Sequence, residues 1–242
     1  METKDIDFAA IPQKAINVVT RPAEFFQAMP KTGGFMEPLV FAAIMGLVAG
    51  VIQAVLSVIG LGHGGAYGAG VKSGLAMIIF MPIFAAIGSF IGAAILFVIW
   101  KLMGSQEEYE TAYRCGAYLM VLTPITSIIN VVPYAGVIIS LAICTFYIVT
   151  ASVHAHNIPS QKAWLVFGII GIIFALGSVF AQQRARNMTP EWEKLRQASE
   201  EYRKSARDME KSTEALRKQN EEMIKQAREQ MEEAKRQAEQ NQ

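Results

Sequence analysis

Five long windows of the sequence are apolar and almost free of charge, and they restrict the chain to a membrane fold. The hydrocarbon core of a bilayer is about 30 Å thick, and a helix needs about 20 mainly apolar residues to cross it. A helix on the surface of a soluble protein would carry a charged face, which these windows lack. The sequence therefore predicts an all-α, polytopic membrane helix bundle of about five transmembrane helices. The windows are residues 38–60, 74–103, 115–132, 134–153 and 163–181.

Most of the charge lies near the C-terminal end of the chain. Residues 184–242 hold 14 of the 22 Lys and Arg residues and 13 of the 21 Asp and Glu residues. This shift predicts three parts: an N-terminal segment (1–37), a transmembrane bundle (38–183) and a charged coiled-coil helix (184–242). The net charge of +1 provides no basic field for nucleic acid. Cys115 and Cys144 lie in apolar windows, so we interpret them as small hydrophobic residues.

A short amphipathic stretch precedes the first window. Phe25, Phe26 and Met29 fall on one helical face, and Pro22 suits the first turn of a helix. We interpret the stretch as an amphipathic helix that lies in the membrane interface. A cap packed on the bundle is an equally good interpretation, because both arrangements bury the same apolar face.

The connections between the windows are glycine-rich, polar or very short. Residues 61–70 read as a glycine-rich loop and residues 105–114 as a polar connection. Residues 130–133 form a tight break, so the third and fourth windows either span fully or form a re-entrant hairpin. With the N-terminus inside, the inner flanks hold seven Lys and Arg residues and the outer flanks five, which favours a cytosolic N-terminus.

Glycine, proline and uncharged polar residues inside the windows predict how the helices pack. Two Gly-x-x-x-Gly motifs, at 46–50 and 88–92, let helix backbones approach closely. Pro82 and Pro124 interrupt helical hydrogen bonding and are expected to kink their helices, and Tyr118 and Pro133 are expected to help shape the bundle. Uncharged polar groups either hold helices together or line a path through a pore. These residues are Gln53, Ser89, Thr126 and Asn130.

The charged segment has the sequence repeat of a coiled coil. Thr189 and Pro190 predict the start of a helix, and no glycine or further proline follows them. Apolar residues then recur every seven positions, which predicts a left-handed supercoil. Self-association into a parallel oligomer, binding of a partner protein and a solvated single helix are the three interpretations. The predicted assembly residues are Leu195, Tyr202, Met209, Leu216, Asn220 and Met223.

Residues that carry chemistry form no recognisable catalytic or cofactor motif. His154 and His156 could contribute to a metal site, but the sequence offers no third and fourth ligand nearby. Glu107, Glu108 and Glu110 could bind a cation, although a solvated acidic loop fits them better. No ionisable residue lies at the centre of a window, as ion-coupled transport would require. The sequence therefore predicts no catalytic, cofactor or metal site.

Four stretches of the chain resemble the Yip family (Ypt-interacting proteins) of multi-span membrane proteins. They are RPAEFF at 21–26, ETAYRCGAY at 110–118 with Thr-Pro at 123–124, VPY at 132–134 and HAHNIPSQKA at 154–163. The resemblance covers roughly residues 15–182 and implies a five-span bundle with a cytosolic N-terminus. Eukaryotic members are linked to vesicle trafficking, small GTPases and membrane shaping. This chain lacks their long N-terminal cytosolic region with its acidic, aromatic motif and adds a coiled-coil tail, so it is more similar to the prokaryotic branch.

These features support one leading functional hypothesis. The chain is expected to be a non-enzymatic integral membrane scaffold that oligomerises or recruits a protein partner through its coiled coil, with a role in membrane organisation or trafficking. The alternative is a channel or transporter formed by an oligomer of the bundle. The expected location is the cytoplasmic (inner) membrane of a prokaryote, with the lipid bilayer and further copies of the chain as partners.

Overall fold

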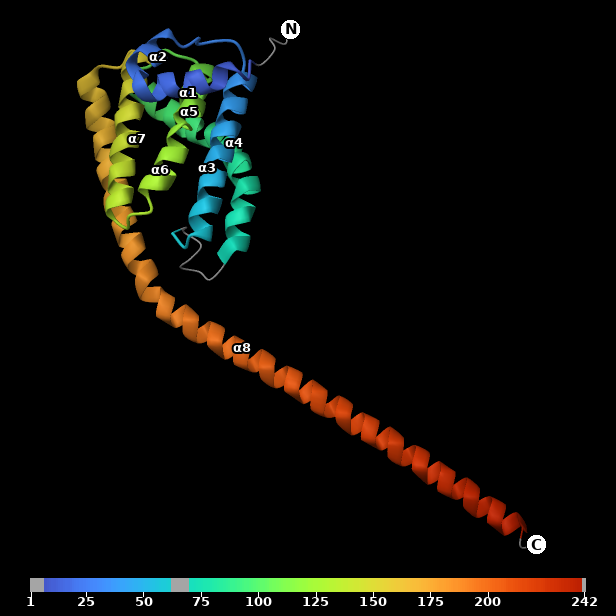
Figure 1. Ribbon diagram of the computed structural model, residues 1–242. Coiled ribbons are helices and arrows are strands. Elements are labelled where there is room, and N and C mark those ends of the chain that lie inside the picture. The colour runs from blue at the N-terminus through green and yellow to red at the C-terminus, as the bar shows by residue number, and fades with distance from the viewer. Residues whose placement is uncertain (1–6, 62–69, 241–242) are drawn as a thin grey trace. The chain divides into compact units, whose positions relative to one another are not determined.

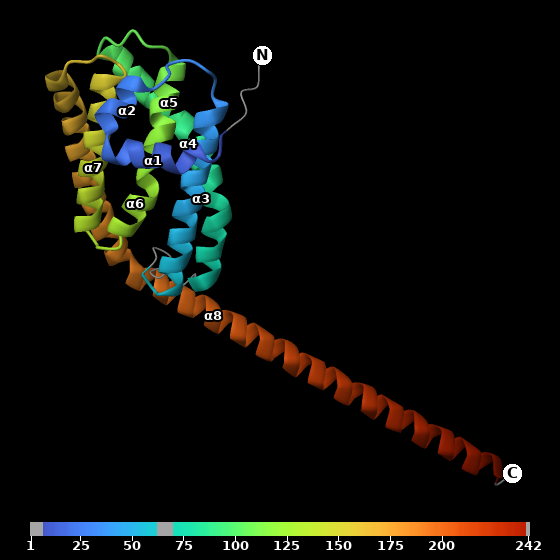
Figure 2. The same cartoon turned by 45° about the horizontal axis from the view of Figure 1, so that its top comes forward.

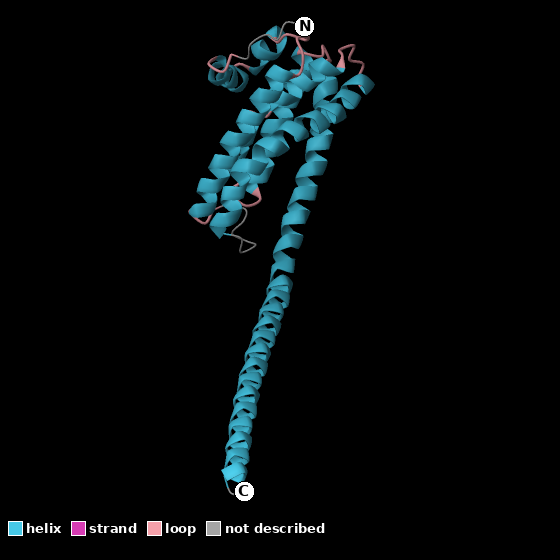
Figure 3. Cartoon of the chain, turned by 90° about the vertical axis from the view of Figure 1, so that its right-hand side faces the viewer, coloured by secondary structure: helices cyan, strands magenta, loops and turns pink. Residues whose placement is uncertain are grey.

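The computed structural model describes residues 7–61 and 70–240, and all regular structure within them is helical (Figure 3). The chain divides into two compact units, Met1–Gln183 and Arg184–Gln242. Figure 1 labels the helices. They are α1 (Ala10–Thr20), α2 (Pro22–Ala28), α3 (Met36–Val58), α4 (Gly70–Leu102), α5 (Tyr109–Leu119), α6 (Leu122–Ile129), α7 (Ala135–His154) and α8 (Ser160–Gln240).

The first unit contains several helices that are long and apolar enough to cross a membrane. Four segments meet this condition singly: Met36–Val58, Gly74–Leu102, Ala135–His154 and Ser160–Arg184. The bent pair α5 and α6 makes a fifth if it counts as one span. Large apolar side chains such as Ile91, Ile172 and Phe180 are exposed on these helices, and a bilayer rather than water accommodates them. The predicted all-α polytopic membrane bundle is therefore confirmed, and the protein is an integral membrane protein in contact with lipid.

The third window differs from its prediction. Its helix begins at Tyr109, so residues 109–114 are helical instead of part of a polar connection. The helix then breaks at Met120 and Val121, and α5 and α6 meet at an angle of 41°. Pro124 explains the break, because it has no backbone N–H to donate to the carbonyl of Met120. That carbonyl instead accepts from the backbone N–H of Thr123 at 3.0 Å and from its hydroxyl at 2.7 Å.

One of the two glycine motifs forms a close helix contact. A Cβ at Gly46 would lie 2.6 Å from the Cβ of Ala85, and one at Gly50 would lie 2.6 Å from the carbonyl oxygen of Met77. The α3 and α4 backbones therefore touch where the motif on α3 predicts it. Gly88 and Gly92 make no such contact, because a Cβ there would meet nothing within 4 Å in the described part of the chain.

The last span of the first unit is the beginning of α8, and two hydrogen bonds place its ends. At one end, Lys162 Nζ donates to the carbonyl oxygen of Met103 at 2.7 Å. At the other end, the backbone N–H of Tyr134 donates to Gln182 Oε1 at 3.1 Å. Between these ends, a Cβ at Gly171 would lie 2.7 Å from Thr145 Oγ1, so this part of α8 runs beside α7.

The amphipathic stretch before the first span folds as the short helix α2, and a second short helix, α1, which the sequence did not predict, precedes it. Figures 1 and 2 both show α1 crossing the direction of α3 and α7. Pro22 is the first residue of α2, as predicted. Val18 and Phe26 are fully buried and Met29 is nearly so, because their apolar face packs on the bundle.

The second unit is the remainder of α8, and it corrects the predicted start of the C-terminal helix. Because α8 extends from Ser160 to Gln240, Thr189 and Pro190 lie inside a helix instead of starting one. A proline inside a helix loses one hydrogen bond and costs about 3 kcal/mol. Here residues 181–186 and 191–198, rich in Ala, Gln, Glu and Arg, have high helix propensity on both sides and offset that cost.

Candidate functional site

The two N-terminal helices are fastened to the bundle by contacts from residues far apart in the sequence. Tyr147 of α7 donates its hydroxyl hydrogen to the carbonyl oxygen of Val19 at 2.7 Å. The rings of Phe25 and Tyr118 meet edge to face with centroids 5.1 Å apart, which joins α2 to α5. We refer to α1, α2 and the following loop, residues 10–35, as the N-terminal cap. Its position decides which polar groups gather at this end of the bundle.

Arg114 of α5 is almost fully buried although it is charged. Its Nη1 donates to the carbonyl oxygen of Gly34 at 2.9 Å, and its Nη2 lies 3.5 Å from Glu37 Oε2. A guanidinium stays charged when it is buried, so it requires such partners. Gly33 and Gly34 have φ of +126° and +86°, a backbone conformation that lets the loop turn around the guanidinium. Arg114 thereby sets the path of the chain into α3.

Glu37 joins three helices through its carboxylate. It lies in the first turn of α3, accepts from Lys14 of α1 and faces Arg114 of α5. Two cations share one carboxylate at the boundary between the cap and the bundle. Because each partner comes from a different helix, this triad locks the relative positions of α1, α3 and α5.

The acidic loop that precedes α5 also holds the cap. Lys31 Nζ lies 2.6 Å from Glu107 Oε1, and the backbone N–H of Gly34 donates to Glu110 Oε1 at 2.6 Å. Thr111 adds a hydroxyl hydrogen bond of 3.3 Å to the carbonyl oxygen of Lys31. Two of the three acidic residues are thus engaged by the cap, so the prediction of a simply solvated loop is wrong. Polar groups of the cap loop, instead of water, provide the hydrogen bonds of Glu107 and Glu110.

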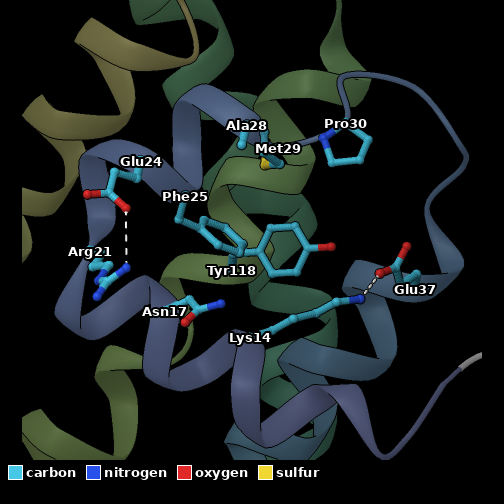
Figure 4. Close-up of a pocket in the computed structure, with 10 residues that line it drawn as sticks. All are labelled: Lys14, Asn17, Arg21, Glu24, Phe25, Ala28, Met29, Pro30, Glu37 and Tyr118. Atoms are coloured by element: carbon cyan, nitrogen blue, oxygen red, sulfur yellow. Dashed lines mark hydrogen bonds and ion pairs between the residues drawn. The ribbon is translucent and has the colours of Figure 1, made fainter.

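A pocket of about 510 Å³ opens between the cap and the bundle (Figure 4). Lys14 and Asn17 of α1 and Arg21, which directly follows α1, form a polar wall of the pocket. Phe25 and Tyr118 form an apolar wall, and Figure 4 shows an ion pair on either side of their rings. The remaining lining residues are Glu24, Ala28, Met29, Pro30 and Glu37. Charges of both signs beside aromatic rings suit an amphiphilic ligand.

A second polar cluster lies at the same end, between α4 and the loop after α7. The rings of Trp100 and His156 are stacked with centroids 3.9 Å apart, and both residues are buried. Trp100 Nε1 donates to Ser152 Oγ at 2.7 Å, and Ser105 Oγ lies 2.9 Å from His156 Nδ1. Burial lowers the pKa of His156 from its ordinary value of 6.5 to about 4, so the imidazole is neutral at pH 7.

The histidines and acidic residues considered as metal ligands are not brought together. His156 is stacked on Trp100, and Glu107 and Glu110 are engaged by the cap. Among the residues that the structure describes, no three His, Cys, Asp or Glu side chains form a group that could hold a metal ion. Cys115 is buried and Cys144 half-buried, and both are free thiols.

The uncharged polar residues of the spans mostly bond locally. Ser89 Oγ donates to the carbonyl oxygen of Ala86 at 2.7 Å, and Thr126 Oγ1 to that of Thr123 at 3.2 Å. Asn130 is the exception, because its Oδ1 accepts from Ser140 of α7 at 2.9 Å and so joins two helices. Gln53 is half-buried in α3. Of these hydrogen bonds, the one between Asn130 and Ser140 therefore contributes to helix packing.

Sequence reasoning missed the triad of Lys14, Glu37 and Arg114. The signal was present, since Arg114 and Glu37 are single charges at the edges of apolar windows. Burying an ionisable residue in that position costs free energy unless it is paired, so each of the two residues is expected to have a partner of opposite charge. Pairing them required knowing that α3 and α5 start at the same end of the bundle and side by side.

The fold and this site define a class of protein: a polytopic helical membrane protein whose N-terminal cap is locked onto its bundle by ion pairs. The model of the Yip1 domain family matches residues 16–181, well over half of the chain. The chain belongs to the Yip1 domain family, a family of non-enzymatic membrane proteins, and the resemblance seen in the sequence is confirmed. No curated protein and no solved structure matches the chain at a significant level.

Proposed function

We propose that this protein is a membrane scaffold whose Yip1 domain holds it in the bilayer while its C-terminal helix associates with a second copy of the chain. The observation that carries the proposal is an exposed apolar seam on α8. The five seam residues recur every seven positions and are 54 to 84% exposed. Side chains of this size at this spacing are typical of a helix that packs against another helix. They are Leu195, Tyr202, Met209, Leu216 and Met223.

The charges beside the seam favour a second copy in parallel orientation. The coiled-coil seam has a second row, Ser199, Ala206, Thr213 and Asn220. In a parallel pair, each residue directly after the Leu195 row faces a residue of the other helix that lies directly before this second row. The first group is Arg196, Arg203, Glu210 and Arg217, and the second is Ala198, Ser205, Ser212 and Gln219. No like charges therefore meet in a parallel pair. An antiparallel pair would bring the first group, with its three arginines, against itself.

The position of Asn220 supports the same register. It occupies the seam row that also contains Ser199, Ala206 and Thr213. A polar residue at one such position specifies alignment, because any shift would bury its amide against an apolar partner. The small residues of this row let the two helices approach closely.

The test is the mass of the full-length protein in detergent or nanodiscs, measured by light scattering. Met209→Glu combined with Leu216→Glu places two carboxylates in the seam and should convert a defined oligomer to a monomer. The matched control is Gln197→Glu combined with Ala215→Glu, which adds the same charge to the exposed outer face of the helix. The control should keep the mass of the wild type.

Two outcomes would overturn self-association. Equal masses for the seam variant and its control would mean that the seam does not hold the copies together. A monomeric wild type would mean that the tail binds a different protein, and proteins captured by full-length bait but not by the seam variant would identify it.

The proposed scaffold resides in the cytoplasmic membrane of a prokaryote with its N-terminal cap in the cytosol. The excess of Lys and Arg on the flanks beside the cap supports this orientation. In a chain with Cys115 and Cys144 replaced by Ala, Gln13→Cys gives an exposed thiol on α1. An impermeant maleimide should label it in inside-out vesicles only. Labelling of intact spheroplasts would instead place the cap on the outer side of the membrane.

A further inference from the structure

The pocket beside the cap contains one cation and one carboxylate that the cap does not need. Lys14 and Glu37 are held in the triad with Arg114. Arg21 and Glu24 are paired only at 3.8 Å, and both side chains are more than 70% exposed. An exposed pair of this kind contributes little to stability, so a ligand that offers better partners can separate it.

The location of the pocket restricts the ligand to molecules of the bilayer boundary. Glu37 is in the first turn of the span that begins at Met36. Tyr147 fixes the end of α1 seven residues before the end of α7, which is about 10 Å along a helix. The pocket thus lies beside the final turns of the spans, at the depth where lipid headgroups and the first carbons of their chains meet protein.

The arrangement of groups in the pocket matches a zwitterion attached to an apolar chain. A guanidinium binds a phosphate through two parallel hydrogen bonds, so Arg21 is suited to a phosphodiester, and the amide of Asn17, one helical turn away, is a second donor. A carboxylate accepts hydrogen bonds from a primary ammonium, so Glu24 is suited to the other end of the zwitterion. The Phe25 and Tyr118 rings provide the apolar surface (Figure 4).

We propose that this pocket binds the headgroup of a zwitterionic phospholipid with a primary ammonium, such as phosphatidylethanolamine, with Arg21 at its phosphate and Glu24 at its ammonium. A bound lipid would then contact the cap and the first span together. The scaffold would in this way be sensitive to the composition of the leaflet on the cap side. This site is independent of the tail and of its oligomerisation.

The experiment measures lipid binding to the full-length protein in detergent by native mass spectrometry. The probes are dioctanoyl phosphatidylethanolamine, dioctanoyl phosphatidylglycerol and soluble phosphoethanolamine. Phosphatidylethanolamine should bind most tightly. Arg21→Gln and Glu24→Gln should each weaken its binding about tenfold, the loss expected for one charge-assisted contact. Arg184→Gln, which removes an exposed arginine outside the pocket, should leave binding unchanged.

Three results would overturn the proposal. Equal phosphatidylethanolamine binding in wild type, Arg21→Gln and Glu24→Gln would show that the pocket does not hold the lipid. Phosphatidylglycerol binding as tightly, with no effect of Glu24→Gln, would remove the ammonium contact. Phosphoethanolamine binding as tightly as the lipid would assign the pocket to a soluble ligand. Thermal melts of each variant should have the wild-type midpoint, which would show that a loss of binding does not come from unfolding.

Discussion

The guanidinium of Arg114 lies 3.5 Å from the carboxylate of Glu37 and is almost completely buried, whereas the carboxylate is partly open to water and also holds Lys14. The two residues lie in different helices, 77 positions apart in the sequence, and are in contact where the cap joins the bundle. Removing one partner of a buried pair leaves an uncompensated charge, which is why this contact should be sensitive to substitution.

Glu37→Gln should destabilise the protein more than Glu24→Gln does. The first change leaves Arg114 with only the carbonyl of Gly34 as a strong partner, and we expect a loss of about 2 kcal/mol. The second removes an exposed pair and should cost less than about 1 kcal/mol. Thermal melts in one detergent measure both. Equal midpoints for the two variants would contradict the importance of the triad.

Exchanging the charges of the Lys31–Glu107 ion pair should restore the stability that either single substitution removes. Lys31 Nζ and Glu107 Oε1 lie 2.6 Å apart, so Lys31→Glu or Glu107→Lys alone places like charges close together and should loosen the cap. The double variant should recover most of the loss, with a coupling energy of up to about 1 kcal/mol because both side chains are partly exposed. Protease cleavage rates in the cap report the loosening. Additive losses in the double variant would show that the two residues act independently.

Acid should weaken the folded protein through His156. The unfolded chain protonates this imidazole below about pH 6.5, whereas the folded protein keeps it neutral until about pH 4. Between these values the unfolded state binds the extra proton, so the free energy of unfolding falls as the pH is lowered from 6.5 to 4.

His156→Gln removes the titrating group but keeps a polar side chain near Ser105. We expect its melting midpoint to depend less on pH between 6.5 and 4 than that of the wild type. Over this range, the change in the free energy of unfolding should differ between the two proteins by at most about 3 kcal/mol. His154→Gln, which removes the half-buried neighbouring histidine, is the control. A wild-type slope in His156→Gln would exclude His156 as the source.

Alanine should destabilise the protein at Gly50 but not at Gly88, although both glycines belong to the same type of motif. Gly50→Ala forces a methyl group to within 2.6 Å of the carbonyl oxygen of Met77, so α3 and α4 must separate at a cost of about 1 to 3 kcal/mol. Gly88→Ala meets none of the described residues within 4 Å and should be neutral or stabilising by up to about 1 kcal/mol, because alanine favours a helix. The melting midpoints of the two variants, compared with that of the wild type, test this prediction. A loss for Gly88→Ala would mean that its face packs against something outside this chain.

Local features of the sequence were sufficient for the membrane fold. Windows 38–60, 74–103 and 134–153 each became a helix within a few residues of its predicted ends. Pro22 began a helix, and Pro124 accompanied a break. These features depend on the length of an apolar run and on the missing N–H of proline, which are properties of neighbouring residues alone.

The tertiary structure alone decided which partners the charged residues at the cap end of the bundle have. Residues 109–114 read as a polar connection, yet they fold as the buried start of α5 because Lys31, Gly34 and Glu37 provide partners from a different part of the chain. The cap, the pocket and the stacked Trp100 and His156 arise in the same way. Such contacts join residues 50 to 130 positions apart, and a local pattern cannot specify them, because the cost of burying a charge or an imidazole depends on what the fold places beside it.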